Sequence, residues 1–79
     1  MSPTVFQEGG YRFFFFSREE TRMHIHVNYT EGEAKFWLEP EIELAGNYGL
    51  SRKQLKTIEE IIEKRQDEIR NAWKKYFKS

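Results

Sequence analysis

The pattern of hydrophobic and polar positions along the chain predicts an antiparallel sheet that begins with a hairpin. Residues 4–8 and residues 11–17 are two β-favouring runs, and Gly9 and Gly10 stand between them as a typical hairpin turn. The second run carries phenylalanine on both of its alternating faces. We therefore expect this strand to be covered on both sides, by a helix on one side and by a partner, a loop or a second chain on the other.

The next two runs alternate regularly between apolar and polar residues. In residues 23–30 the apolar side chains fall on one face, while His24, His26 and Asn28 fall on the opposite face. A turn follows, and residues 33–38 alternate in the same way, with Ala34, Phe36 and Leu38 expected inward. Both runs are therefore expected to be strands with one face in the core.

A further strand is expected at the edge of this sheet. Residues 41–44 alternate again after Pro40 and are a candidate fifth strand. Residues 46–49 have the sequence Gly-Asn-Tyr-Gly, which is typical of a loop. The predicted sheet therefore has four or five strands, all within residues 4–44.

The rest of the chain has the spacing of a helix. Ser51 and Gln54 form the signature of a capping box at its start. The apolar positions that follow recur three or four residues apart or at multiples of that spacing: Leu55, Ile58, Ile62, Ile69, Trp73 and Tyr76. A continuous helix over about 52–78 would be roughly 40 Å long, which exceeds the width of a domain of this size. Either the helix bends at the polar patch of residues 63–68, or its second half projects and packs on another subunit. Since no glycine or proline marks a break, we predict one helix and an oligomer.

These elements together predict an α+β fold. It consists of a four- or five-stranded antiparallel β-meander followed by one long C-terminal α-helix packed on the sheet. The chain is expected to form a single domain, residues 1–79, because 79 residues leave room for one core only.

Composition excludes several classes of protein. There is no cysteine, so a disulfide framework, a thiolate nucleophile and a cysteine-based zinc site are all excluded. No stretch approaches the ~20 apolar residues of a membrane helix, and the first residues do not have the pattern of a secretory leader. We therefore expect a cytoplasmic protein that does not associate with membranes.

Charge is unevenly distributed although the formal net charge is zero. Residues 1–50 hold four Lys or Arg against eight Glu, a balance of −4, and residues 51–79 hold nine against five acidic residues, a balance of +4. An acidic half and a basic half suit self-association or a charged partner surface. A basic footprint over the whole domain, as expected for a dedicated DNA-binding protein, is absent.

His24 and His26 are the strongest candidates for chemistry. Two histidines at positions i and i+2 of a strand face the same way, and histidine is the side chain that titrates unperturbed near neutral pH. Such a pair can act as general acid and base. It can also contribute to a metal site, although two ligands are fewer than the three or four that zinc needs. The third interpretation is two half-exposed histidines without a chemical role. We expect no cofactor.

Cations and aromatic residues are expected on the same face. Lys35 and Arg12 are candidates to stabilise the negative charge that develops on a phosphate beside the histidines. Trp37, Phe14 and Phe16 also fall on the histidine face if the alternation holds, where they either stack on unpaired bases or pack in a core or dimer contact. The candidate catalytic set is therefore His24, His26, Lys35 and Arg12.

Several blocks of sequence together resemble a known family. They are Pro3-Thr4-Val5, Tyr11-Arg12-Phe13-Phe14-Phe15-Phe16-Ser17, His24-Ile25-His26-Val27, Glu33-Ala34-Lys35-Phe36-Trp37 and Trp73-Lys74-Lys75-Tyr76-Phe77. The chain resembles an uncharacterised family of small prokaryotic proteins, a domain of unknown function marked by the Phe-Phe-Ser run and the His-x-His pair. Genes of this family often sit beside another small gene, as in toxin–antitoxin pairs, so the resemblance implies a two-protein module.

The sequence supports two alternative functions. The first is a protein-interaction component of a toxin–antitoxin-like pair, which forms a homodimer or binds a cognate small protein. The second is a ribonuclease-like toxin that uses His24 and His26 as an acid–base pair and has RNA as its partner. Accessibility separates the two, because a catalytic pair must line an open concavity beside a cation.

Overall fold

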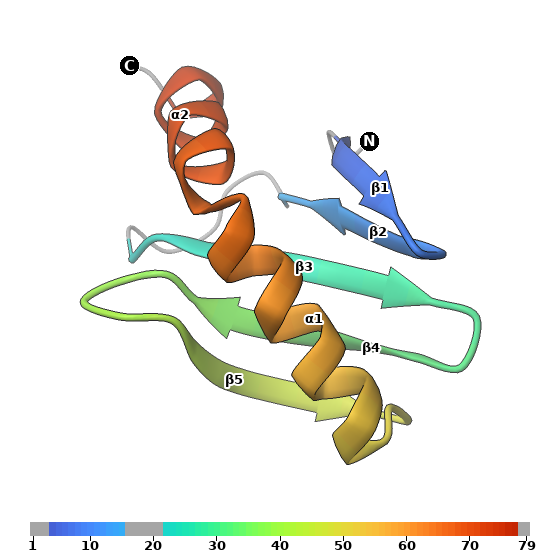
Figure 1. Ribbon diagram of the computed structural model, residues 1–79. Coiled ribbons are helices and arrows are strands. Elements are labelled where there is room, and N and C mark those ends of the chain that lie inside the picture. The colour runs from blue at the N-terminus through green and yellow to red at the C-terminus, as the bar shows by residue number, and fades with distance from the viewer. Residues whose placement is uncertain (1–3, 16–21, 78–79) are drawn as a thin grey trace.

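The computed structural model describes residues 4–15 and 22–77, and these form one five-stranded sheet with two helices on one of its faces (Figure 1). The elements in chain order are β1 (Thr4–Glu8), β2 (Tyr11–Phe14), β3 (His24–Tyr29), β4 (Gly32–Trp37), β5 (Glu43–Tyr48), α1 (Arg52–Lys64) and α2 (Gln66–Tyr76). The strands lie side by side in sequence order and every neighbouring pair is antiparallel. The predicted α+β class and antiparallel meander are therefore confirmed, with five strands. Phe16 and Ser17, at the end of the second predicted strand, lie outside the described residues.

The first hairpin forms as the sequence predicts. Gly9 has a φ of 61° and Gly10 a φ of 85°, so both turn residues are left-handed. Two successive left-handed residues are the requirement of a type I′ turn, whose twist matches that of the strands it joins. Glycine supplies this conformation without a steric penalty.

The fifth strand was predicted over residues 41–44 but runs over Glu43–Tyr48, so the expectation that all strands end by residue 44 was wrong. β5 continues through Gly46 and Asn47 to Tyr48, where a loop was expected. The register between β4 and β5 shifts between Lys35 and Phe36, which leaves one additional residue in β5. Pairing with β4 through this β-bulge outweighs the local turn preference of glycine and asparagine.

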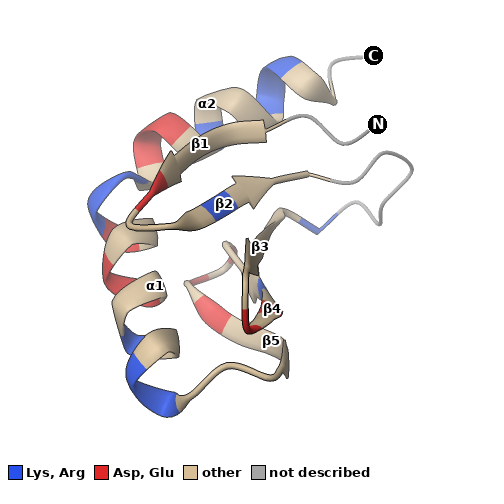
Figure 2. Ribbon diagram, turned by 90° about the vertical axis from the view of Figure 1, so that its right-hand side faces the viewer, with Lys and Arg blue, Asp and Glu red and all other residues tan. Residues whose placement is uncertain are grey.

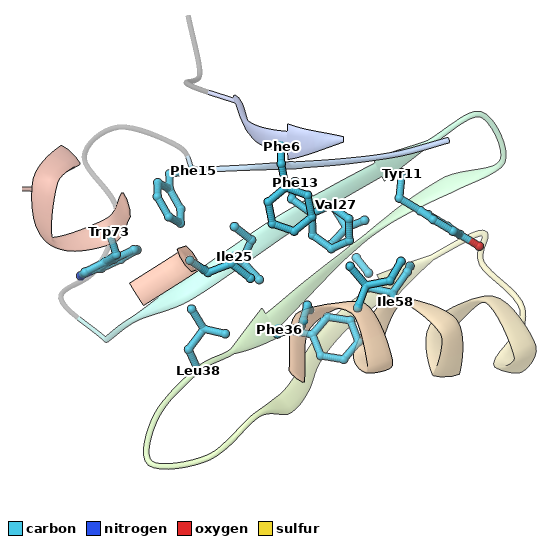
Figure 3. Packing of buried hydrophobic residues seen from close by; sticks show 14 of the residues in the cluster. Phe6, Tyr11, Phe13, Phe15, Ile25, Val27, Phe36, Leu38, Ile58 and Trp73 are labelled. Atoms are coloured by element: carbon cyan, nitrogen blue, oxygen red, sulfur yellow. The ribbon is translucent and has the colours of Figure 1, made fainter. Parts of the chain in front are cut away.

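The core fills the space between the sheet and the helices (Figure 3). Phe13, Ile25 and Val27 of the central strands have no exposed surface, and neither has Ile58 of α1. The inward-facing residues of β4 were predicted correctly, because Ala34 and Phe36 are both buried. Alternation therefore identified the core face of each central strand.

The predicted single long helix was wrong, because the helix breaks at Arg65. The capping box at Ser51 and Gln54 is present, and α1 begins as predicted. Arg65 then has a φ of −114° and a ψ of 24°, which ends α1 and starts α2. Its guanidinium lies 3.7 Å from the centroid of the Phe6 ring and donates a hydrogen bond of 2.9 Å to Glu8. These contacts with β1 hold the break without a glycine or proline.

The break brings the second half of the helical region back onto the same core. Ile69 has no exposed surface and Trp73 is 8% exposed. In Figure 1, α1 crosses β3, β4 and β5, and α2 continues past the start of β3. A second subunit is therefore not needed to bury these α2 side chains. The homodimer stays a prediction that rests on other surfaces.

Candidate functional site

The sheet face opposite the helices, called the outer face below, carries the histidines in cross-strand rows. One row joins residues that are register partners from β1 to β5: Thr4, Phe14, His26, Lys35 and Gly46. The neighbouring row is Gln7, Arg12, Asn28, Glu33 and Tyr48. On the other side, His24 is the register partner of Trp37. Strand alternation thus places three of the four predicted site residues in two adjacent rows.

His24 is enclosed, although it lies on the outer face. Its exposed fraction is 0%, and its ring centroid lies 5.0 Å from that of Trp73 and 5.8 Å from that of Trp37. Its Nδ1 atom donates a hydrogen bond of 2.7 Å to the main-chain carbonyl oxygen of Arg22, and its Nε2 atom is buried. A ligand on the surface therefore contacts the side chains that cover His24 and not His24 itself.

His26 is half-buried and takes part in a stack of rings. Its ring lies 5.6 Å from the ring of Phe14 with an interplanar angle of 26°, and 5.1 Å from the ring of His24. The Nε2 atom of His26 is buried below the surface. Lys35 is its register partner on β4. Directly opposed residues on one face of a sheet have Cβ atoms about 4.5–5.5 Å apart, so the side chains of His26 and Lys35 lie beside the same region of the surface.

That space is a hollow between β3, β4 and β5. The outer hollow, as we call it, has a volume of about 300 Å³ and is lined by His26, Glu33, Ala34, Lys35, Gly46, Asn47 and Tyr48. Tyr48 forms part of its wall and is 77% exposed. A Cβ atom added at Gly46 would meet nothing within 4 Å, so the missing side chain of this glycine leaves the hollow open.

Arg12 lies on β2 in the row next to that of His26. Its guanidinium carbon is 4.4 Å from the centroid of the Phe14 ring, in cation–π geometry. Its Nε atom donates a hydrogen bond of 2.8 Å to the hydroxyl of Thr4. Phe14 itself is 4% exposed, so phenylalanine is buried on both faces of β2, as the sequence predicted.

Trp37 holds two more cations on the outer face. The guanidinium carbon of Arg22 is 4.2 Å from its ring centroid, and the Nζ atom of Lys35 is 4.4 Å from it. Arg22 also donates a hydrogen bond of 2.9 Å to the carbonyl oxygen of Glu39 and lies 4.0 Å from a carboxylate oxygen of Glu43. The ring of Trp37 therefore positions positive charge beside the histidine rows.

The structure places His26, Lys35 and Arg12 on one face of the sheet, as the sequence predicted, and it encloses His24; the catalytic role of these residues stays a prediction. Sequence reasoning missed Gly46 and Tyr48, because both were placed in a loop. The alternation of residues 41–44 indicated a strand here, but continued through residue 48 it would have placed Gly46 and Tyr48 on the face of Leu44, and the β-bulge at Ala45 is what moves them to the outer face. Phe16, also expected on the histidine face, lies outside the described residues.

A metal site gains no third ligand in the described part of the chain. Among residues 4–15 and 22–77, no group of three or more His, Cys, Asp or Glu is arranged to hold a metal ion. Zinc needs three or four protein ligands, and His24 and His26 supply two. The metal-binding role predicted for His24 and His26 therefore stays a prediction that rests on these two ligands.

One carboxyl group and one phenolic hydroxyl group on the helix side of the sheet have shifted pKa values. Hydrogen bonds from Arg65 and Lys64 lower the pKa of Glu8 below its ordinary value. Burial raises the pKa of Tyr11, whose ring stacks on that of Tyr29 at 4.3 Å. Both pKa shifts arise from packing of β1 and β2 against their neighbours, so Glu8 and Tyr11 stabilise the fold and are not part of the outer face.

The chain belongs to the family described as Domain of unknown function (DUF4160). The family matches residues 10–74, which include every strand but β1 and both helices up to Lys74. Neither the curated proteins nor the solved structures contain a match to this chain. The family assignment therefore agrees with the resemblance found in the sequence and leaves the activity to be argued from the site.

A helix that spans a membrane must reach a certain length and hydrophobicity. In the part of the chain that the structure describes, neither α1 nor α2 is long and apolar enough to span a membrane.

Proposed function

We propose that this protein is a protein-interaction module, one component of a toxin–antitoxin-like pair, and that its partner adds a strand to the edge of β5. The observation that carries the proposal is that all six residues of β5 are exposed. β5 ends the sheet, so one side of its main chain faces away from β4. An edge strand presents a row of N–H and C=O groups on which an extended segment of another protein can pair.

The side chains of β5 favour such an addition. Leu44 is 43% exposed and Tyr48 is 77% exposed, and they stand on opposite faces of the sheet. An added strand would therefore gain apolar contacts on both sides. Natural edge strands are commonly protected by lysine or proline, and residues 43–48 contain neither. The two-protein context rests on the family resemblance, and the docking position rests on β5.

Co-expression with the product of the neighbouring gene tests this proposal. We expect a stable complex on size exclusion with light scattering, and slowed amide hydrogen exchange confined to residues 43–48. Leu44→Lys is expected to dissociate the complex because it places a charge at the docking edge. Gln7→Lys, on the opposite edge strand β1, is the matched control and should leave the complex intact. A complex that survives Leu44→Lys would contradict the proposed edge.

Self-association is measured in the same experiment. Two β5 strands paired antiparallel about a centre between Ala45 and Gly46 would place Glu43 of each copy opposite Tyr48 of the other, so the only charges in the strand stay apart. A concentration-dependent dimer of the chain alone that is lost in Leu44→Lys would make a second copy the partner.

A second candidate function is RNA cleavage at the outer hollow. The observation that favours it is the placement of His26 opposite Lys35 beside an open hollow. A histidine can accept the proton of a ribose hydroxyl, and a nearby lysine can stabilise the charge on the phosphate. Because His24 is enclosed and the Nε2 atom of His26 is buried, the two-histidine acid–base pair has less support than partner binding.

A cleavage assay on labelled single-stranded RNA separates the roles of the two histidines. If the protein is a ribonuclease, His26→Ala should abolish cleavage, and a chelator should leave it unchanged. His24→Asn, which retains a hydrogen-bond donor, should reduce cleavage only as far as it disturbs the fold. Absence of cleavage by the purified wild type across several RNAs would remove this candidate.

A further inference from the structure

We propose that the outer hollow binds one unpaired nucleotide of a single strand, with the base against Tyr48 and the phosphate toward Lys35. The proposal concerns binding alone, so it holds whether or not the chain cleaves RNA and whether or not β5 binds a partner. It gives Gly46 and Tyr48 of β5 a second role beside the proposed edge pairing, and it adds Glu33, which neither proposed function uses.

The shape of the hollow suits one planar group. Its volume of about 300 Å³ is at the small end of the range of ligand sites. Tyr48 presents a largely exposed ring at its wall, and Gly46 leaves the floor beside that ring without a side chain. An exposed aromatic ring beside an open floor is the arrangement on which unpaired bases stack.

The two ends of the hollow have different chemistry. Glu33 and Tyr48 are register partners and form one end, whereas Lys35 and Gly46 are register partners and form the other with His26. A carboxylate accepts hydrogen bonds from the exocyclic amino group of a base and repels a phosphate. The base is therefore assigned to the end with Glu33, and the phosphate to the end with Lys35.

The distribution of cations supports a polyanion rather than an isolated base. Residues 1–50 have a net charge of −4, yet the three lysine and arginine residues that the structure describes in this half all lie on the outer face. They are Arg12, Arg22 and Lys35, each over an aromatic ring. Figure 2 shows blue segments on β2 and just before β3. Positive charge held on aromatic rings along a sheet is suited to the backbone of a single strand.

The test measures fluorescence anisotropy with labelled decamers of cytosine, adenine or uracil at low salt, as ribose and deoxyribose strands. We expect oligo-C and oligo-A to bind more tightly than oligo-U, because only the first two bases present an exocyclic amino group to Glu33. Glu33→Gln should reduce that preference. Weaker binding of the deoxyribose strands would identify RNA as the source of the nucleotide, and equal binding would identify single strands of either kind.

Two pairs of variants show whether the hollow itself is the site. Gly46→Val fills the hollow with a residue that favours strands, and Ala45→Val adds similar bulk at the neighbouring position of β5 as its control. Tyr48→Ala removes the ring, and Tyr48→Phe restores it. We expect Gly46→Val and Tyr48→Ala to weaken binding about tenfold, on the scale of one lost stacking contact, with both controls close to wild type.

Three results would overturn the proposal. The first is a wild type that binds none of the strands at low salt. The second is a Gly46→Val or Tyr48→Ala variant that melts like the wild type and binds with unchanged affinity. The third is a poly-glutamate peptide that competes as well as unlabelled oligo-C, because the face would then recognise charge alone.

Discussion

The Nδ1 atom of His24 donates a hydrogen bond of 2.7 Å to the carbonyl oxygen of Arg22, and this bond separates the two histidines in role. It connects an enclosed ring to the segment that enters β3. His26, two residues later, keeps part of its ring at the outer hollow. His24 is therefore a residue that supports the face, and His26 is a residue that a ligand can contact.

Substitution of the two histidines should consequently have unequal effects on stability. We expect His24→Ala to lower the free energy of unfolding by about 2–4 kcal/mol, because it leaves a cavity and removes the hydrogen bond to the carbonyl oxygen of Arg22. His26→Ala should cost about 1 kcal/mol, in the range of an ordinary half-buried position. Urea denaturation of the two variants beside wild type measures this difference. Equal losses would show that the two rings are similarly enclosed.

Trp73 should anchor α2 to the rest of the fold. Its ring contacts those of Phe15 and His24 at centroid distances of 5.3 and 5.0 Å, and α1 does not depend on these contacts. Trp73→Ala should lower the free energy of unfolding by about 3–5 kcal/mol. Hydrogen exchange should accelerate first in α2. Tyr76→Ala, which removes a ring that is 37% exposed, is the control and should have a smaller effect.

Arg65 should contribute more to stability than its neighbour Lys64, although both donate hydrogen bonds to Glu8. Arg65 also stacks on Phe6 and bonds to Glu68 through two nitrogen atoms. Thermal melts should therefore show a larger decrease in Tm for Arg65→Ala than for Lys64→Ala. A similar decrease in both would mean that the stacking on Phe6 contributes nothing measurable to the helix break.

Stability should fall in acid through Glu8. Because its pKa is lower in the folded state than the ordinary value of 4.5, the folded protein binds a proton less readily than the unfolded chain. The stabilisation is complete above that ordinary value and is lost as the pH falls through the lower folded value. Glu8→Gln should remove this part of the pH dependence in denaturation curves between neutral and acid pH. An unchanged acid limb would contradict the assignment to Glu8.

The sequence predicted the central part of the fold because alternation and turn chemistry are local. The Gly9-Gly10 hairpin, the inward face of β4 and the capping box at Ser51 each depend on neighbours within a few residues, and each was confirmed. The shared face of His26, Lys35 and Arg12 also followed from strand period and is confirmed by the register.

The end of β5 and the break at Arg65 depend on residues far apart in the sequence. Local preference favoured a loop at Gly46 and a continuous helix through Arg65. Pairing with β4 extended the strand, and contacts with Phe6 and Glu8 stabilised the break. Neither the pairing of β5 with β4 nor the contacts of Arg65 with Phe6 and Glu8 can be recognised from the local sequence pattern.

By itself, then, the sequence determined the class of fold, the core face of the central strands and the residue types on the outer face, since these follow from period and composition. Only the tertiary structure decided that His24 is enclosed, that Tyr48 joins Lys35 at a hollow and that α2 packs on its own chain. Burial and proximity of this kind arise when distant strands and helices are brought into register, and no local pattern contains that information.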